Sequence, residues 1–277
     1  MTTIETTVPV AAPPVSRSEI RPRHAGFVND VISVASRAIR SIGREPEFVA
    51  PAIIIPVFFF FVNTGAMQDI TQAQAPGFDY KAFALPACII FGVTGISRAG
   101  VVVTDVQDGY FDRLLLTPVR RLALLLGMMV ADVVLVAALC VPIVLLGLLA
   151  GVDFETGVLG MLGFVVLGSL WGLVFTGFPY AIALKTGNPA AVNSSFLLFF
   201  PFAFLTTSFM PRQALTGWMD TVSTYNPVTY LLDGMRVLVT DGWEWDVIGK
   251  AVLAVAGVGV VSMWLCFAAL RGRLKSG

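Results

Sequence analysis

Charged residues are scarce in this sequence, and histidine and cysteine are nearly absent. Asp, Glu, Lys and Arg make up only 13% of the 277 residues, against about 25% in a soluble globular chain, which excludes an ordinary soluble domain. The single histidine, His24, excludes a histidine metal centre or a histidine proton relay. Cys88, Cys140 and Cys266 stand in apolar runs at no metal-ligand spacing, so we expect neither a metal site nor a disulfide.

The sequence also lacks the glycine-rich phosphate-binding loop of an ATPase. That loop requires Gly-x4-Gly-Lys followed by Ser or Thr. The two Lys-Ser/Thr pairs, Lys185-Thr186 and Lys275-Ser276, are instead each preceded by Leu. We therefore expect this chain to hydrolyse no ATP, to bind no cofactor or metal of its own, and to have no nucleic-acid partner.

Long apolar runs dominate what is present. The sequence is 56% hydrophobic, with a mean hydropathy of +0.82. Six runs are long enough to cross the ~30 Å hydrocarbon core of a bilayer as helices: about 47–64, 82–104, 120–149, 156–184, 190–208 and 247–270. The sequence thus predicts an all-α membrane protein with six transmembrane helices.

Positive charge sets the expected orientation, because Lys and Arg are retained on the cytoplasmic side. With the N-terminus inside, 14 of the 18 Lys and Arg residues fall in cytoplasmic segments. We therefore expect both termini to be cytoplasmic. Residues 1–24, rich in Pro and Thr, are predicted to be a disordered cytosolic tail ahead of one transmembrane domain at 25–277.

An amphipathic helix is predicted at about 27–44. Its apolar side chains recur at helical spacing, with polar and Arg side chains opposite. Such a helix suits the inner membrane interface, with its Arg residues toward lipid headgroups, and it equally suits packing on other parts of the protein.

A charged island between Arg98 and Arg121 connects the second and third predicted spans. A short helix is expected at about 105–117, ending where Thr117-Pro118 begins span three. A solvated turn is the plainer interpretation, but large apolar side chains in a cytosolic hairpin favour a partner surface. The candidate contact residues are Asp105, Asp108, Tyr110, Phe111, Asp112, Arg113, Leu114 and Leu115, joined by Lys185 and Asn188 of the shorter connection 185–189.

The outer segment at about 210–240 is too apolar for a loop and too interrupted for a span. Asn226 and Pro227 form an N-cap and first-turn proline, which predicts a helix over 227–239, preceded by a shorter one at about 213–221. We expect a re-entrant helical hairpin in the outer leaflet, in which Asp233 and Arg236 pair.

Asp132 is the one acid inside a predicted span. An intramembrane carboxylate is a functional candidate, although hydrogen bonding to a neighbouring span would give it a structural role. Four phenylalanines of span five are candidates for a substrate path or for lipid contact: Phe196, Phe199, Phe200 and Phe204. Close glycines in span four, Gly168 and Gly172 especially, predict tight helix packing within one subunit or across a dimer seam.

Three motifs in order resemble the permease subunit of a type-2 ABC exporter, in particular the daunorubicin-resistance (DrrB-like) permeases. The motifs are Asp108, Gly109, Asp112, Arg113, Leu114, Thr117 and Pro118; then Gly127, Ala131 and Asp132; then Asn226 to Arg236. The resemblance covers roughly residues 27–270.

The resemblance implies a separate nucleotide-binding ATPase, which carries the ATP and Mg, docked on a coupling helix at about 105–117. It also implies a second permease copy or paralogue, a location in the bacterial cytoplasmic membrane among lipid, and export of a hydrophobic drug or lipid. Two other classes remain open from the residues alone: a secondary, proton-coupled carrier using Asp132, and a membrane enzyme or anchor. The last is disfavoured because no paired carboxylates or Ser-base arrangement converge.

Overall fold

The computed structural model describes residues 26–42, 46–94, 96–107 and 121–276, and within these ranges the chain forms helices and turns without a strand. The longer helices are α1 (Phe27–Ile42), α2 (Pro46–Gln74), α3 (Tyr80–Thr94), α4 (Ala99–Gln107), α6 (Arg121–Leu149), α7 (Gly157–Thr186), α11 (Pro227–Thr240) and α12 (Trp245–Ser276). Shorter ones are α8 (Pro189–Ser194), η1 (Ser195–Leu198), α9 (Phe199–Phe204), η2 (Arg212–Ala214) and α10 (Trp218–Tyr225).

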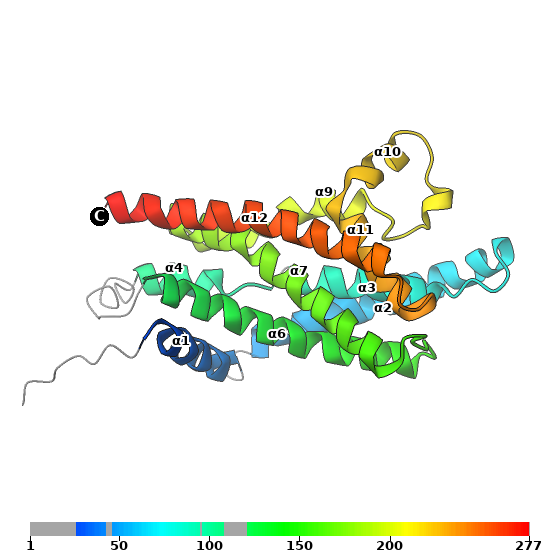
Figure 1. Ribbon diagram of the computed structural model, residues 1–277, viewed down its shortest axis with the longest axis horizontal. Helices are drawn as coiled ribbons and strands as arrows, with labels where there is room; N and C mark the ends of the chain where they lie inside the picture. Colours follow the sequence, from blue (N-terminus) through cyan, green and yellow to red (C-terminus); the bar gives the residue numbers. More distant parts are fainter. Residues whose placement is uncertain (1–25, 43–45, 95, 108–120, 277) are drawn as a thin grey trace, which may run out of the picture.

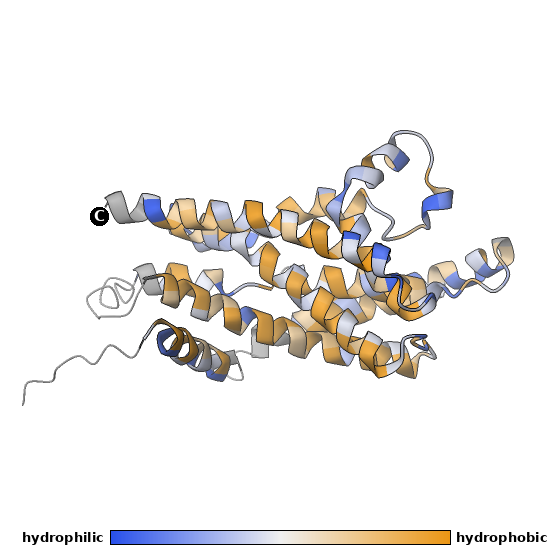
Figure 2. Ribbon diagram, viewed as in Figure 1, coloured by the Kyte–Doolittle hydropathy of each residue, from blue (hydrophilic) through white to orange (hydrophobic). Residues whose placement is uncertain are grey.

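The helices form one elongated bundle whose members run roughly along its long axis (Figure 1). Helix α1, the visible end of α4 and the C-terminal end of α12 lie at the same end of the bundle. Apolar residues colour most of the length of the helices, and hydrophilic ones gather toward the ends and connections (Figure 2). This distribution is the one that a bilayer requires.

The expected all-α membrane class is confirmed. Five stretches are long and apolar enough to span a membrane: Ala50–Ala73, Tyr80–Thr104, Leu122–Leu149, Gly157–Thr186 and Trp245–Gly272. The fifth predicted span corresponds to a shorter apolar stretch, Pro189–Phe204. The prediction for span one ended too early at 64. Helix α2 continues to Gln74, because polar side chains suit an exposed helix end as well as a loop.

The second predicted span is interrupted, which the sequence interpretation missed. Helix α3 ends at Thr94 and α4 begins at Ala99. The backbone N–H of Arg98 donates to the Asp132 carboxylate instead of to a helical carbonyl, and the N–H of Ala99 is bound by the Ser97 hydroxyl over 3.1 Å. A side chain from another helix thus competes with the helical hydrogen bonds at this point.

The fifth predicted span, 190–208, is also wrong as one continuous helix. Residues 195–198 form a 3-10 turn between α8 and α9, and the helix ends at Phe204. Pro201 has no N–H to bond the turn before it, and the Ser194 and Ser195 hydroxyls bond back to the carbonyls of Ala190 and Val192. Both features weaken a regular helix.

Close packing of the central helices occurs within the subunit, as the glycines predict. A side-chain carbon on Gly172 of α7 would lie 2.9 Å from Val136 of α6, and one on Gly168 would lie 3.1 Å from Ile89 of α3. A side-chain carbon on Gly177 of α7 would lie 2.8 Å from the hydroxyl of Ser262 on α12. Helix α7 therefore occupies the centre of the bundle, in contact with α3, α6 and α12.

Candidate functional site

Asp132 of α6 lies in a buried junction between helices. Its side chain is fully buried. The backbone N–H of Arg98 donates to its Oδ1 over 3.2 Å, and the hydroxyl of Tyr180 on α7 donates to its Oδ2 over 2.9 Å. A buried carboxylate requires such donors, because it has lost its water. These bonds hold the start of α4 against α6 and α7.

The guanidinium of Arg98 extends this junction to the amphipathic helix α1. Arg98 is 5% exposed, and it donates to the carbonyl of Ala38 over 3.1 Å and to the hydroxyl of Ser41 over 2.7 Å. We call Asp132, Arg98, Tyr180 and Ser41 the Asp132 junction. It joins α1, α4, α6 and α7 through one continuous set of polar contacts. The hydrogen bonding considered for Asp132 is thus present, and Tyr180 is a partner that sequence reasoning missed.

Helix α1 is seated directly on α6. A side-chain carbon on Gly127 would lie 2.7 Å from Cβ of Val34 and 2.9 Å from the carbonyl of Val31. Ala35 and Ala38 are buried, whereas Val28 and Ile32 are 66% and 58% exposed. One face of α1 therefore packs on protein, and apolar side chains remain on another.

The two predicted contact segments for a partner meet at their described ends. Gln107, the last residue of α4, donates from its side chain to the carbonyl of Gly187 over 3.0 Å. Gly187 closes α7 in a left-handed conformation (φ 58°), and the exposed Asn188 caps α8 by accepting from the N–H of Ala190. Lys185 is exposed beside them.

Most of the predicted coupling helix lies outside the described residues. Asp105 falls within α4, whose helix begins six residues earlier than expected. Residues 108–120, and with them Asp108, Tyr110, Phe111, Asp112, Arg113, Leu114 and Leu115, have no structural description.

The four candidate phenylalanines do not share one environment. Phe199 is fully buried and packs against Phe91 and Phe175 with ring centroids 5.7 Å and 5.6 Å away. Phe200 and Phe204 are 39% and 42% exposed and stack on each other at 5.5 Å. Phe196 lines a small hollow of about 90 Å³ together with Thr94, Ser97, Asn193 and Ser195, beside the break between α3 and α4.

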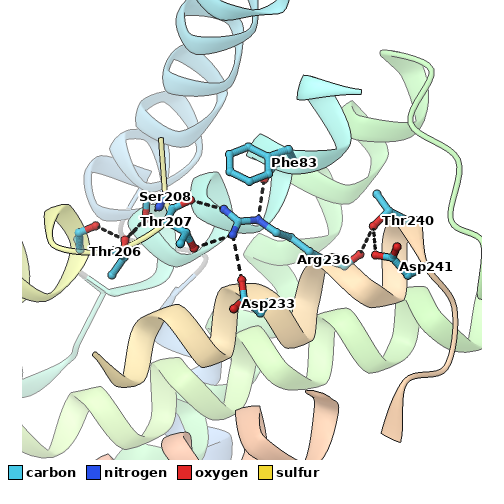
Figure 3. A network of polar contacts seen from close by, with 9 residues as sticks. Phe83, Thr206, Thr207, Ser208, Asp233, Arg236, Thr240 and Asp241 are labelled. Carbon is cyan, nitrogen blue, oxygen red and sulfur yellow. Dashed lines mark hydrogen bonds and ion pairs between the residues drawn. The ribbon is translucent and has the colours of Figure 1, made fainter. Parts of the chain in front are cut away.

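Arg236 of α11 is the centre of a second buried network (Figure 3). Its guanidinium donates to the Thr207 hydroxyl over 2.7 Å, to the Thr207 carbonyl over 2.5 Å and to the Phe83 carbonyl over 3.3 Å, with its carbon 3.8 Å from the centre of the Phe83 ring. The expected pair with Asp233 is confirmed at 3.2 Å. Burial lowers the pKa of Arg236 to about 10, against the opposing effect of Asp233, so the guanidinium stays charged at neutral pH. Burial likewise raises the pKa of Asp233, with Arg236 opposing.

Asn226 ties the hairpin of α10 and α11 to the end of α9. As the Asn-Pro pair predicts, its side-chain oxygen caps α11 by accepting from the N–H of Val228 over 3.0 Å. Its amide nitrogen also donates to the carbonyls of Phe202 and Leu205, over 2.7 Å and 2.8 Å. The shorter helix, however, starts at Trp218 instead of about 213, after Gly217 in a positive-φ conformation.

Comparison with known proteins decides the family. The ABC-2 type transporter family matches residues 29–239. The chain belongs to this family. It is therefore an ABC transporter permease, a multi-pass protein of a bacterial membrane.

Three members of the family illustrate which permeases this chain is similar to. The chain is 28% identical to the daunorubicin resistance ABC transporter permease protein DrrB1 of Streptomyces coeruleorubidus, over 98% of this chain and 95% of that protein. It is 21% identical to a probable doxorubicin resistance ABC transporter permease protein, DrrC, of Mycobacterium tuberculosis, over 85% and 86% of the two chains. It is also 21% identical to a putative transport permease, ycf38, of Pyropia yezoensis, over 90% and 91%.

This ABC-2 permease shows no gathering of metal ligands in its described parts. No three His, Cys, Asp or Glu side chains come together there. Membership of the ABC-2 family supports an ABC transporter permease. The Asp132 junction is then a joint between helices.

Proposed function

We propose that this permease exports a hydrophobic or amphipathic compound, a drug or a lipid, across the cytoplasmic membrane, using ATP hydrolysed by a separate subunit. The observation that carries the proposal is the contact between Gln107 and Gly187, which joins the described end of the first connection to the second. The names of the drug-resistance relatives favour the same substrate class.

The ATP-binding subunit, with its ATP and Mg²⁺, docks on the segment at 105–117 and on the loop at 185–189. Tyr110, Phe111, Leu114 and Leu115 supply an apolar contact face in the first segment, and exposed Lys185 and Asn188 extend it in the second. One surface formed from both connections allows a single docked subunit to displace α4, α7 and α8 together.

The Asp132 junction transmits that displacement. Because Arg98 binds α1 through its side chain and Asp132 through its backbone, a shift of α4 acts on α1, α6 and α7 simultaneously. A buried polar network of this kind favours a few discrete arrangements, because partial separation leaves buried groups unpaired.

The proposed ATPase contacts place the connections at 105–117 and 185–189 in the cytoplasm, and this fixes the orientation of the permease in the membrane. The permease has six spans with both termini in the cytoplasm, the fifth being the short, broken stretch Pro189–Phe204. Helix α1 lies in the inner interface, with its exposed Val28 and Ile32 toward lipid, and α10 and α11 form a re-entrant hairpin at the outer side. A second permease, a copy or a paralogue, completes the path, to which Phe196 and the exposed Phe200 and Phe204 contribute from this chain, with the buried Phe199 packed behind them.

Co-expression with a candidate ATP-binding subunit tests the proposal. Inside-out vesicles that hold both chains are expected to accumulate a hydrophobic dye when ATP is added. The double variant Tyr110→Ala with Phe111→Ala is expected to lose co-purification of the ATPase and ATP-driven uptake together, because its apolar contact face is gone.

Tyr225→Ala is the matched control, since it removes an aromatic side chain that is 82% exposed on the outer hairpin. It should co-purify the ATPase like the wild type. Uptake and association that survive in the double variant would refute the docking site, and uptake without any ATP-binding subunit would refute the proposed energy source.

A further inference from the structure

An apolar cavity of about 350 Å³ lies between α7, α9, α11 and α12. Its volume falls within the range of small-molecule pockets. Trp171, Phe175 and Phe178 of α7 form one wall, Phe202 and Pro227 close it from α9 and α11, and Gly257 with its neighbours Ala254, Val258 and Val261 forms the α12 side.

The aromatic wall is fixed in place. Trp171 and Phe175 are 2% and 4% exposed, with ring centroids 5.9 Å apart, and Phe178 packs on Phe175 at 5.4 Å. The indole N–H of Trp171 already donates to the Thr94 hydroxyl over 2.9 Å. The carbonyl of Phe202 is held by Asn226. The indole N–H and the Phe202 carbonyl are therefore already bonded, and the cavity offers an occupant apolar and aromatic contacts instead of hydrogen bonds.

Gly257 lines the cavity from the α12 side and is exposed. A side-chain carbon added at Gly257 would meet no atom within 4 Å, although the residue stands in a helix that packs along α7. A larger side chain can therefore be added at this lining position without displacing protein atoms. Gly249, two turns earlier on the same helix, is equally unobstructed but does not line the cavity.

The mouth of the cavity lies among apolar side chains on membrane-spanning segments. Val261 of α12 and Phe202 of α9 are 53% and 49% exposed, and Val260 and Trp264 of α12 are 71% and 66% exposed. An occupant thus enters from the hydrocarbon region and brings no charge, because no lining side chain is polar apart from the bonded indole.

The geometry points to a binding site for the planar, uncharged ring system of an amphipathic compound dissolved in the membrane. Phe178 of α7 and Phe202 of α9 are the accessible aromatic side chains of the lining, and Trp171 and Phe175 are buried in the α7 wall. Two accessible rings on two sides of a cavity favour a flat ring, which they contact face-on or edge-on, over a saturated chain, which gains no such contact. That this compound is the one transported rests on the proposed function. The site would select substrates by an apolar ring, with their polar groups left outside.

Photolabelling of the complete permease and ATPase complex in lipid vesicles tests the site, with 1-azidopyrene as a neutral planar probe. Labelled peptides are expected from 171–178 and 254–261. Gly257→Phe should lower this labelling about tenfold, because its ring fills the space of the ligand. Gly249→Phe, the matched control, should leave it unchanged. Val261→Trp provides a second test at the mouth if Gly257→Phe assembles poorly.

Three results would overturn the site. Undiminished labelling in both Gly257→Phe and Val261→Trp would show that the probe binds elsewhere. Labelling of the same peptides only by a phosphatidylcholine with a photoactivatable acyl chain would assign the cavity to lipid. Cross-linking of Gly257→Cys to a second permease copy, with no labelling by 1-azidopyrene, would assign it to the dimer interface.

Uptake of a fluorescent pyrene derivative by the same vesicles separates this inference from the proposed function. If Gly257→Phe loses the cavity labelling but the wild type shows no ATP-driven uptake, the site is supported and the export function is refuted. Normal uptake together with normal labelling in both Gly257→Phe and Val261→Trp would refute the site alone.

Discussion

The hydroxyl of Tyr180 on α7 donates a hydrogen bond to the carboxylate of Asp132 on α6 across 2.9 Å, with both side chains fully buried. The same carboxylate binds the backbone of Arg98, where the second apolar stretch is interrupted. One intramembrane acid thus fixes the position at which α3 gives way to α4, the helix that leads toward the proposed ATPase contact.

Removal of the Tyr180 hydroxyl is expected to destabilise the permease. Tyr180→Phe leaves a buried carboxylate one donor short, which costs about 1–3 kcal/mol of unfolding free energy. Thermal unfolding of the purified protein should show a lower midpoint than the wild type. Tyr225→Phe, at a hydroxyl-bearing ring that is 82% exposed, should leave the midpoint unchanged.

A double-mutant cycle tests whether this cost passes through Asp132. In an Asp132→Leu background, where the Tyr180 hydroxyl has lost its acceptor, Tyr180→Phe should cost less than in the wild type, with a coupling of about 0.5–3 kcal/mol. Equal costs in the two backgrounds would show that the hydrogen bond does not stabilise the helix junction.

The sequence predicted the helical membrane class and the long helices well, because runs of apolar residues report burial in lipid directly. The sequence-based prediction of helices was wrong where a side chain from another helix interrupts a run of apolar residues. Between Ile90 and Thr104 the glycines and Ser97-Arg98 weaken a helix without marking where it breaks, and the cause, Asp132, is distant in sequence. The environment of Asp132 was likewise unpredictable, because Tyr180 and Arg98 reach it only after α4, α6 and α7 have packed.

The Asn-Pro pairs predicted the starts of helices correctly. Asn188-Pro189 and Asn226-Pro227 both marked real N-caps, because an Asn cap and a first-turn proline act within a few residues. What the sequence did not reveal is that Asn226 also binds two carbonyls at the end of α9. Those contacts depend on a chain reversal some twenty residues long.

A larger residue at Gly127 is expected to displace α1 from α6. Gly127→Val would place side-chain carbon against Val34 and the carbonyl of Val31, and overpacking of this kind costs about 1–3 kcal/mol. Limited trypsin digestion should then cut faster after Arg37 and Arg40, which α1 carries. Gly249→Val, in open space on α12, is the control, and equal digestion rates in the two variants would contradict the packing role of Gly127.

Cysteine labelling of intact cells checks the proposed orientation. Cys88, Cys140 and Cys266 are buried, so a membrane-impermeant maleimide should leave the wild type unlabelled. Trp218→Cys, at a position 68% exposed on the hairpin, should react from outside. Lys185→Cys, exposed at the end of α7, should react only after the membrane is opened. The reverse pattern would mean that the permease is inserted the other way round.

Substitution of the two capping asparagines by serine separates capping from long-range bonding. Serine retains an N-cap acceptor but is too short to reach the carbonyls of Phe202 and Leu205. Asn226→Ser is therefore expected to lose about 1–3 kcal/mol of unfolding free energy, because two buried carbonyls lose their donor. Asn188→Ser, at an exposed cap without such contacts, should be nearly neutral, since serine caps about as well as asparagine. Thermal unfolding of both variants measures the difference, and equal midpoints would show that Asn226 serves only as a cap and does not fix α11 to the end of α9.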